Sequence, residues 1–312
     1  MAPVHPRIQE LIEAEASADA QPWRPSLDEV RAGYLETSAA LGGEPEPVAD
    51  VSDARVPRAG GGSVPVRVYA PVAPAAQLGM LIWLHGGGWV SGDVEGFDRV
   101  ARRLANASGA LCVSVGYRLA PEHPFPAAVE DAKAVVAWAG GHGGVRFGSD
   151  PRRVVVGGDS AGGQVAALAV QHARDRVRAQ LLVYPALDPA CSSESYRAYA
   201  DGPLLTAAEM RGYWAAYLGG GSAGSASERS GQASPLGGDL AGLPQTLIAV
   251  AEHDPVRDDG LAYATALREA GVEVETVAFE TMTHSFLRWS GIVEQADELI
   301  AQLGQATRIA FA

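Results

Sequence analysis

The stretch RVVVGGDSAGGQVAALAVQHAR, residues 153–174, joins a short apolar run to a helical pattern through a turn of small residues. Val154 to Val156 is typical of a strand, and Ala161 to Arg174 is typical of a helix. Between them lies G-x-S-x-G, whose small residues allow Ser160 the strained backbone of a sharp strand-to-helix turn. Such a turn presents a hydroxyl above the end of a strand, so Ser160 is a candidate nucleophile, with an ordinary N-cap serine as the alternative.

The motif alone is weak evidence, because the chain holds 37 glycines among 312 residues. It occurs again at Gly220–Gly224, inside the glycine-rich run Gly219–Ser234, where no strand precedes it. The same run matches G-x-G-x-x-G but lacks the strand and the distal acid of a dinucleotide site. We expect this run to be a mobile linker, with a compact loop as the alternative.

Short β-rich runs alternate with helical ones from residue 47 onward. The expected strands are Pro47 to Val56, Val64 to Tyr69, Met80 to Leu84, Ala110 to Val115, Val154 to Val156, Gln180 to Tyr184, Thr246 to Val250 and Val272 to Phe279. The expected helices are Val94 to Ser108, Ala127 to Ala139, Ala161 to Arg174 and Leu261 to Ala270. Continuous apolar strands are typical of a parallel sheet covered on both faces, so the pattern predicts a doubly wound α/β fold with a hairpin-like edge.

Two segments do not follow this alternation. Residues 1–45 are acidic and amphipathic, and residues 189–240 contain the helix-like stretch Thr206 to Leu218 before the glycine-rich run. We interpret both as parts of a lid on a core formed by residues 46–188 and 241–312.

Composition excludes several classes of protein. Thirty-seven acidic against 24 basic residues, a net charge of −13, leave no basic field for nucleic acid or anionic lipid. Neither H-E-x-x-H nor paired C-x-x-C occurs, so we expect no metal and no cofactor. Cys112 and Cys191 are too few for a disulfide framework, and we find neither an export signal nor a membrane-spanning stretch. We therefore expect a cytoplasmic, soluble protein without a membrane partner.

A second candidate element, His85-Gly86-Gly87-Gly88-Trp89, follows the strand Met80 to Leu84 directly. It therefore lies at the carboxyl end of a strand, where α/β sheets place their sites. Glycines lack Cβ atoms, so their N–H groups can turn toward an acyl oxygen as an oxyanion hole requires. A plain glycine turn is the alternative, but the place of this loop ahead of Ser160 favours an oxyanion loop.

A serine nucleophile needs an imidazole base, and the base needs a carboxylate that fixes its tautomer. His284 follows the strand Val272 to Phe279 through a short loop, and Asp254 follows the strand before it. Together with Ser160 they give the chain order Ser, Asp, His. His253 adjoins Asp254, and adjacent side chains diverge, so those two do not easily form a pair. The histidines expected on the surface or in structural positions are His5, His85, His123, His142 and His172, and the other carboxylates considered are Asp159, Asp188, Asp258 and Asp259.

Five motifs together resemble the hormone-sensitive-lipase-like, or bacterial family IV, esterases of the α/β-hydrolase superfamily. In the family's order they are HGGGWVSGD (85–93), YRLAPEHPFPAAVEDA (117–132), GDSAGG (158–163), AEHDPVRDDG (251–260) and HSF (284–286). The resemblance spans residues 47 to 290. It implies an α/β-hydrolase fold with a mostly parallel eight-stranded sheet, helices on both faces and a helical cap. The family builds its cap from the N-terminal segment and an insertion after the sixth strand, which coincide with the two segments outside the alternation.

The resemblance also implies roles for individual residues. It makes Ser160 the nucleophile, Asp254 the orienting carboxylate and His284 the base, with the N–H groups of Gly87, Gly88 and Ala161 as the oxyanion hole. Two departures concern substrate preference: Ser285 stands where the family often has glycine, and His253 where an aromatic residue is common. We expect the substrate pocket to be walled by Trp89, Leu205, Met210 and Trp214. For Met210, docking of the lid onto the core is an equal alternative.

These features predict a carboxylesterase that hydrolyses short-chain, water-soluble esters through a serine acyl-enzyme. An amidase, a lactonase or a thioesterase would use the same atoms with a different leaving group, so these alternatives stay open. A non-catalytic receptor for a small ligand on this fold would be expected to lose its base, whereas His284 is present. Dimers occur among the relatives, so the resemblance allows a homodimer.

Overall fold

The computed structural model describes residues 2–17, 26–219 and 226–312. The helices in these ranges are α1 (Pro6–Ser17), α2 (Leu27–Leu41), α3 (Asp98–Ser108), α4 (Ala127–Ala139), α5 (His142–Arg146), α6 (Ala161–His172), α7 (Glu194–Ala198), α8 (Ala207–Leu218), α9 (Ala226–Ala233), α10 (Arg257–Glu269) and α11 (Glu294–Phe311). The short 3-10 turns are η1 (Arg174–Arg176), η2 (Pro235–Gly237) and η3 (Phe286–Arg288). The strands are β1 (Asp50–Pro57), β2 (Ser63–Ala70), β3 (Met80–Leu84), β4 (Leu111–Val115), β5 (Val154–Asp159), β6 (Ala179–Val183), β7 (Gln245–His253) and β8 (Val274–Thr283).

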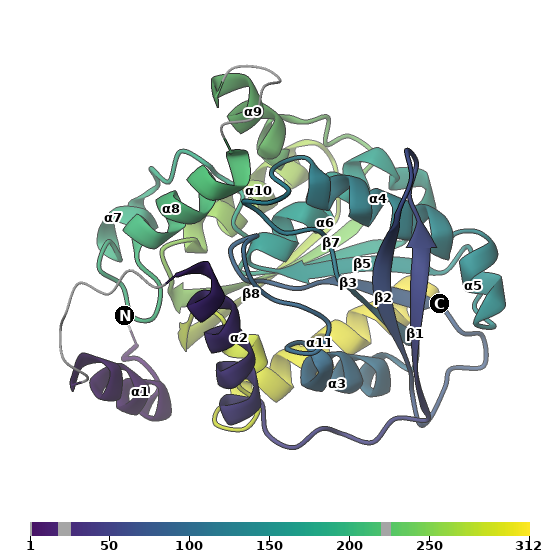
Figure 1. The fold of residues 1–312 in the computed structure, drawn as a ribbon, viewed down its shortest axis with the longest axis horizontal. Coiled ribbons are helices and arrows are strands. Elements are labelled where there is room, and N and C mark those ends of the chain that lie inside the picture. The colour runs from purple at the N-terminus through teal and green to yellow at the C-terminus, as the bar shows by residue number, and fades with distance from the viewer. Residues whose placement is uncertain (1, 18–25, 220–225) are drawn as a thin grey trace.

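The strands form one eight-stranded sheet in the order β1-β2-β4-β3-β5-β6-β7-β8. Strand β2 runs antiparallel to both of its neighbours, whereas β3, β4, β5, β6, β7 and β8 are all parallel to one another. Every residue of β3, β4, β5 and β6 is buried, as expected where helices cover both faces of a parallel sheet. Helices α4, α6 and α10 lie on one face, and α3 and α11 pack together on the other (Figure 1). The predicted α/β-hydrolase architecture, with its mostly parallel sheet, is confirmed.

Most predicted elements of the sheet are present, with small differences at their ends. Strand β3 and helix α4 begin and end where they were predicted. Strand β8 continues to Thr283, so His284 follows it at once, and the prediction of a loop from Glu280 is wrong. The extra pairing of His253 with Thr283, beyond a register shift in β7, extends the strand. The long amphipathic helix α11, which buries Leu299 and Leu303 among others, was not predicted.

Two groups of helices lie outside the doubly wound pattern. Helices α1 and α2 precede the sheet, and α7, α8 and α9 fall between β6 and β7 (Figure 1). Helices α2 and α8 both approach the loop after β3, through Arg31 at Val90 and Tyr213 at Gly88. Helix α9 occupies part of the run that we predicted to be a linker, so that prediction is wrong for Ala226–Ala233. The second G-x-S-x-G match, Gly220–Gly224, lies outside the described residues. Among the residues that are described, no helix combines the length and apolar character needed to cross a membrane.

Candidate active site

Ser160 sits on a strained turn between β5 and α6. Its φ of 55° and ψ of −122° lie in a region that residues other than glycine rarely adopt. The turn fits only because its neighbours are small: a Cβ on Gly158 or on Gly162 would collide with backbone atoms. The Ser160 N–H donates to the carbonyl of Val183 on β6 at 2.9 Å, which ties the turn to the sheet. The hydroxyl is thereby held above the carboxyl end of β5.

A hydrogen-bonded relay joins three side chains that are far apart in the sequence. Nε2 of His284 lies 2.8 Å from Oγ of Ser160, and Nδ1 of the same ring lies 2.7 Å from Oδ2 of Asp254. Asp254 is fully buried, and its other oxygen accepts the N–H of Val256 at 2.9 Å. The acceptor at Nδ1 favours the tautomer in which Nε2 can take a proton from a hydroxyl. The structure thus brings together the three residues that the sequence singled out.

The other candidate groups are engaged elsewhere. Asp159 accepts the indole N–H of Trp83 at 2.9 Å, and burial raises the pKa of its carboxyl. Asp259 accepts backbone N–H groups from the loop after β6, and burial raises its pKa as well. Nε2 of His253 lies 3.0 Å from the carbonyl oxygen of Ala2, so His253 fastens the amino-terminal segment.

The glycine loop after β3 passes beside Ser160. Gly87 and Gly88 have φ values of 121° and 59°, which favour glycine. A Cβ on Gly88 would lie 2.6 Å from the ring of Tyr213, so the loop and α8 approach too closely for a larger residue. The N–H groups of Gly87 and Gly88 donate to no other group in the described part of the chain. Ala161, the first residue of α6, also has an N–H without an intrahelical acceptor. The three N–H groups are therefore available to an anionic oxygen.

His85 is the first residue of this loop, and its buried ring holds the loop in place through stacking and a hydrogen bond. Its ring stacks on Tyr117 with centroids 4.4 Å apart, and Nδ1 lies 2.8 Å from the carbonyl oxygen of Gly86. The Tyr117 hydroxyl donates to the His85 carbonyl at 2.7 Å. Burial lowers the pKa of His85 to about 4, so the ring is neutral near pH 7. A neutral, fully buried ring holds the loop without placing a charge beside Ser160.

A cavity of about 350 Å³ opens above Ser160 and His284. Two of the four residues expected to wall a substrate pocket, Leu205 and Met210, line this cavity, together with Tyr213 from the same insertion. Trp89 and Trp214 do not line it, which corrects their predicted place on the wall. Both are almost fully buried, with their rings 4.2 Å apart, and the Trp89 indole N–H donates to the side chain of Gln164 at 3.0 Å.

Sequence reasoning missed the part of the cavity wall that comes from α2 and η3. Glu29, Val30 and Tyr34 reach the cavity from α2, and Arg288 reaches it from η3. Arg288 lies over the Tyr34 ring, 4.1 Å from its centroid, and donates to the hydroxyl of Ser38 at 2.8 Å. The start of α2 could have been found from its capping box, because the side chains of Ser26 and Glu29 bond each other's backbone N–H groups.

Ser285, where the family often has glycine, has a φ of 69° and a ψ of 4°. This left-handed conformation favours glycine, which explains the family's usual residue. Ser285 directly follows the base His284 and lines the same cavity. Within the described ranges, no three His, Cys, Asp or Glu side chains gather in a way that could hold a metal ion.

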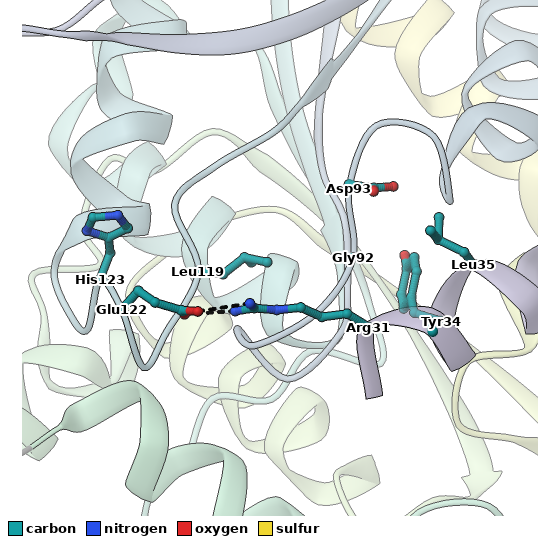
Figure 2. Close-up of a pocket in the computed structure, with 9 residues that line it drawn as sticks. Arg31, Tyr34, Leu35, Gly92, Asp93, Leu119, Glu122 and His123 are labelled. Atoms are coloured by element: carbon teal, nitrogen blue, oxygen red, sulfur yellow. Dashed lines mark hydrogen bonds and ion pairs between the residues drawn. The ribbon is translucent and has the colours of Figure 1, made fainter. Parts of the chain in front are cut away.

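A groove of about 470 Å³ on the other side of α2 contains no member of the relay (Figure 2). Arg31 spans it and forms two hydrogen bonds with the carboxylate of Glu122, at 2.8 and 2.9 Å. This pairing holds the pKa of Glu122 at about 2. Arg31 also donates to the carbonyl of Val90 at 2.9 Å. The groove is therefore where α2 is fastened to the loops after β3 and β4.

The fold and the relay at its strand ends define the class of protein. Residues 81–288 match the family model described as alpha/beta hydrolase fold. This match covers more than half of the chain, and the chain belongs to that family. The resemblance drawn from the five motifs is thereby confirmed.

Individual relatives support the same assignment. The chain is 40% identical over 239 residues to carboxylesterase NlhH of Mycobacterium tuberculosis, covering 75% of each sequence. It is 34% identical over 287 residues to an ethyl acetate hydrolase of Pseudomonas putida, covering 89% of each. Among solved structures, an esterase of Pyrobaculum calidifontis superposes with a TM-score of 0.88 at 37% identity, over 99% of this chain and 100% of that one.

Proposed function

We propose that this protein is a serine carboxylesterase in which Ser160 is the nucleophile, His284 the general base and Asp254 its orienting carboxylate. The observation that carries the proposal is the relay, with 2.8 Å from His284 to Ser160 and 2.7 Å from His284 to Asp254. The relatives described above are a carboxylesterase, an ethyl acetate hydrolase and an esterase, and they support ester hydrolysis as the reaction.

The proposed reaction has two halves. His284 takes the hydroxyl proton as Oγ of Ser160 attacks the ester carbonyl, and the oxyanion accepts hydrogen bonds from the N–H groups of Gly87, Gly88 and Ala161. His284 then gives the proton to the departing alkoxide, which leaves the acyl group on Ser160. A water molecule activated by His284 hydrolyses this acyl-enzyme and restores the serine. One oxyanion donor is typically worth about 10²–10³ in turnover.

We further propose that residues 1–45 and 189–240 form a cap over a core of residues 46–188 and 241–312. Support comes from the cavity above Ser160, to which both segments contribute. Glu29 and Tyr34 come from the first segment, and Met210 and Tyr213 from the second. A cap of this kind excludes water from the reacting atoms while leaving a route for a small ester.

The cavity of about 350 Å³ lies near the small end of ligand sites in proteins, and this supports short-chain, water-soluble esters as substrates. Two buried cysteines, Cys112 and Cys191, are unpaired, which supports a reducing, cytoplasmic setting. Profiling with p-nitrophenyl esters checks the first point: we expect the highest kcat/KM at short acyl chains, and a maximum at long chains would contradict it.

The test of the main proposal is a panel of esters, amides, lactones and thioesters with wild type and Ser160→Ala. We expect ester hydrolysis by the wild type, a loss of roughly 10⁶-fold in kcat on Ser160→Ala, and a stable fluorophosphonate adduct on Ser160. Ser193→Ala is the matched control, because its hydroxyl contacts Ser195 and does not line the cavity. Turnover of amides or thioesters without esters would assign one of the alternative hydrolases instead.

A further inference from the structure

A second cleft lies beside the cavity above Ser160, and His284 lines both spaces. Its volume is about 620 Å³, and it is bordered by α1, α2 and residues on either side of and at the end of η3. The two spaces are adjacent, because five residues line both of them: Thr37, Leu204, His284, Ser285 and Arg288. The second cleft is not lined by Ser160 or by the glycine loop. A group that lies in it is therefore next to the base and away from the oxyanion donors.

The lining of this cleft is mostly apolar. Leu11 and Ala14 come from α1, Ala40 and Leu41 from α2, and Trp289 follows η3. These side chains match the surface of a hydrocarbon or aromatic group.

The charged groups of the cleft do not favour an anionic ligand. Arg288, which lines both spaces, is already engaged with the hydroxyl of Ser38 and the ring of Tyr34. Glu36 is exposed to solvent at the edge. The cleft therefore offers contact area, and neither group is placed to bind a carboxylate or a phosphate.

The proton transfer from His284 indicates on which side of Ser160 the alcohol part and the acyl part of an ester lie. In the first half-reaction, Nε2–H of His284 gives its proton to the ester oxygen as the bond from that oxygen to the acyl carbon breaks, and the free alcohol departs while the acyl group stays on Oγ of Ser160. The alcohol part must therefore lie on the His284 side, and the carbonyl oxygen on the side of Gly87 and Gly88. This assignment leaves the cavity lined by Met210 and Tyr213 for the acyl chain.

We propose that the cleft between α1 and α2 receives the alcohol part of the substrate, and that the enzyme prefers esters of bulky apolar alcohols, of ring size or larger, with short acyl chains. The inference rests on the proposed esterase function. It assigns alcohol preference to the amino-terminal helices and acyl preference to the insertion that contains α8.

The experiment compares ethyl, cyclohexylmethyl and 2-naphthylmethyl acetate, which release primary alcohols and differ mainly in apolar size. We expect wild-type kcat/KM to be about tenfold higher for the naphthylmethyl ester than for the ethyl ester. Ala40→Trp fills the cleft, so it should lower kcat/KM for the naphthylmethyl ester about tenfold and leave ethyl acetate within about twofold. Ala39→Trp is the matched control, since Ala39 is exposed on the same helix and does not line the cleft.

Two further measurements separate the outcomes. The ratio of kcat/KM for ethyl butyrate to that for ethyl acetate reports on the space for the acyl chain. Ala40→Trp should leave this ratio unchanged. If Ala40→Trp fails to fold by thermal melting, Leu11→Trp fills the same cleft from α1 and should give the same loss. An equal effect on all acetates, or a change confined to the acyl ratio, overturns the inference while ester hydrolysis stands. If the wild type hydrolyses no ester and Ser160 takes no fluorophosphonate, the proposed function fails, and the inference fails with it.

Discussion

The strand-end loops and the helices that cover them are held by different kinds of contact. The strand-end loops carry Ser160, Asp254 and His284, each less than one-tenth exposed and each hydrogen-bonded to another buried group. The covering helices α2 and α8 contact the loops from outside the sheet. The arrangement of the loops therefore depends on the geometry of a few hydrogen bonds, which a single substitution destroys. The positions of the covering helices depend on buried apolar area and on ion pairs at the surface.

The two covering helices differ from each other as well. Helix α8 is fixed by aromatic packing, in which Tyr217 stacks on Trp89 at 4.6 Å and Trp214 lies 4.2 Å from the same ring. Helix α2 packs the partly buried Leu27, Val30 and Leu41 against the core, and it is also held by polar groups, above all the pair of Arg31 with Glu122. Salt does not weaken apolar burial by screening, whereas it does screen a partly exposed ion pair. The α2 side of the cap should therefore be the easier side to loosen.

The largest expected effect belongs to the strand-end loops. Asp254→Asn should lower kcat about 10⁴-fold, because an amide at this position favours the wrong tautomer of His284. The melting temperature should change little, since asparagine has nearly the same shape. Steady-state kinetics with a short-chain ester checks this. His253→Asn is the control, because His253 contacts Ala2 instead of the relay and should retain most activity. An active Asp254→Asn variant would refute the assignment.

The next largest effect is expected for a substitution in α8, and it concerns the free energy of unfolding. Trp214→Ala removes a side chain that is 2% exposed and should lower the free energy of unfolding by about 3–5 kcal/mol. Because Trp214 does not line the cavity, residual folded enzyme should keep its kcat. Urea unfolding followed by circular dichroism measures the loss. A drop below 1 kcal/mol would show that the aromatic cluster does not hold the helix.

The buried ring of His85 makes stability depend on pH. Its pKa is about 4 in the folded protein against 6.5 for an ordinary histidine. As pH falls below 6.5, the unfolded chain takes up a proton that the folded chain does not, so the free energy of unfolding decreases until about pH 4. From pH 7 to pH 5 this amounts to about 2 kcal/mol. His85→Asn should flatten the dependence by that amount in urea titrations at the two pH values, and parallel curves would contradict it.

The smallest effect belongs to the groove of Figure 2. The side chains of Arg31 and Glu122 are 31% and 49% exposed, so Glu122→Gln should lower the free energy of unfolding by only about 0.2–1 kcal/mol. The loss should vanish in high salt. Glu130→Gln, which removes an exposed pair with Lys133 on α4, is the control. A salt-independent loss larger than that of Trp214→Ala would reverse the comparison between the two helices.

The contrast between the strand-end loops and the covering helices also separates what could be predicted from the sequence from what could not. The central strands have strong apolar patterns, and Ser160 and Asp254 follow two of them, whereas His284 follows the partly exposed edge strand β8. The sheet and the relay could therefore be predicted from the sequence. The pocket wall could not, because it depends on how helices approach one another. Trp89 and Trp214 have the composition of a pocket wall but pack on each other. Tyr213 faces the cavity because Gly88 leaves room for its ring, a contact across 125 positions of sequence.

The amino-terminal segment is fastened at two points beside the relay. The carbonyl of Ala2 lies 3.0 Å from His253, the neighbour of Asp254, and the N–H of His5 donates at 2.9 Å to the carbonyl of Thr281, three residues before His284. A purification tag added ahead of these residues would therefore emerge where the relay strands end. The carboxyl terminus lies at the opposite side of the molecule (Figure 1), so a tag placed there leaves these two anchors undisturbed.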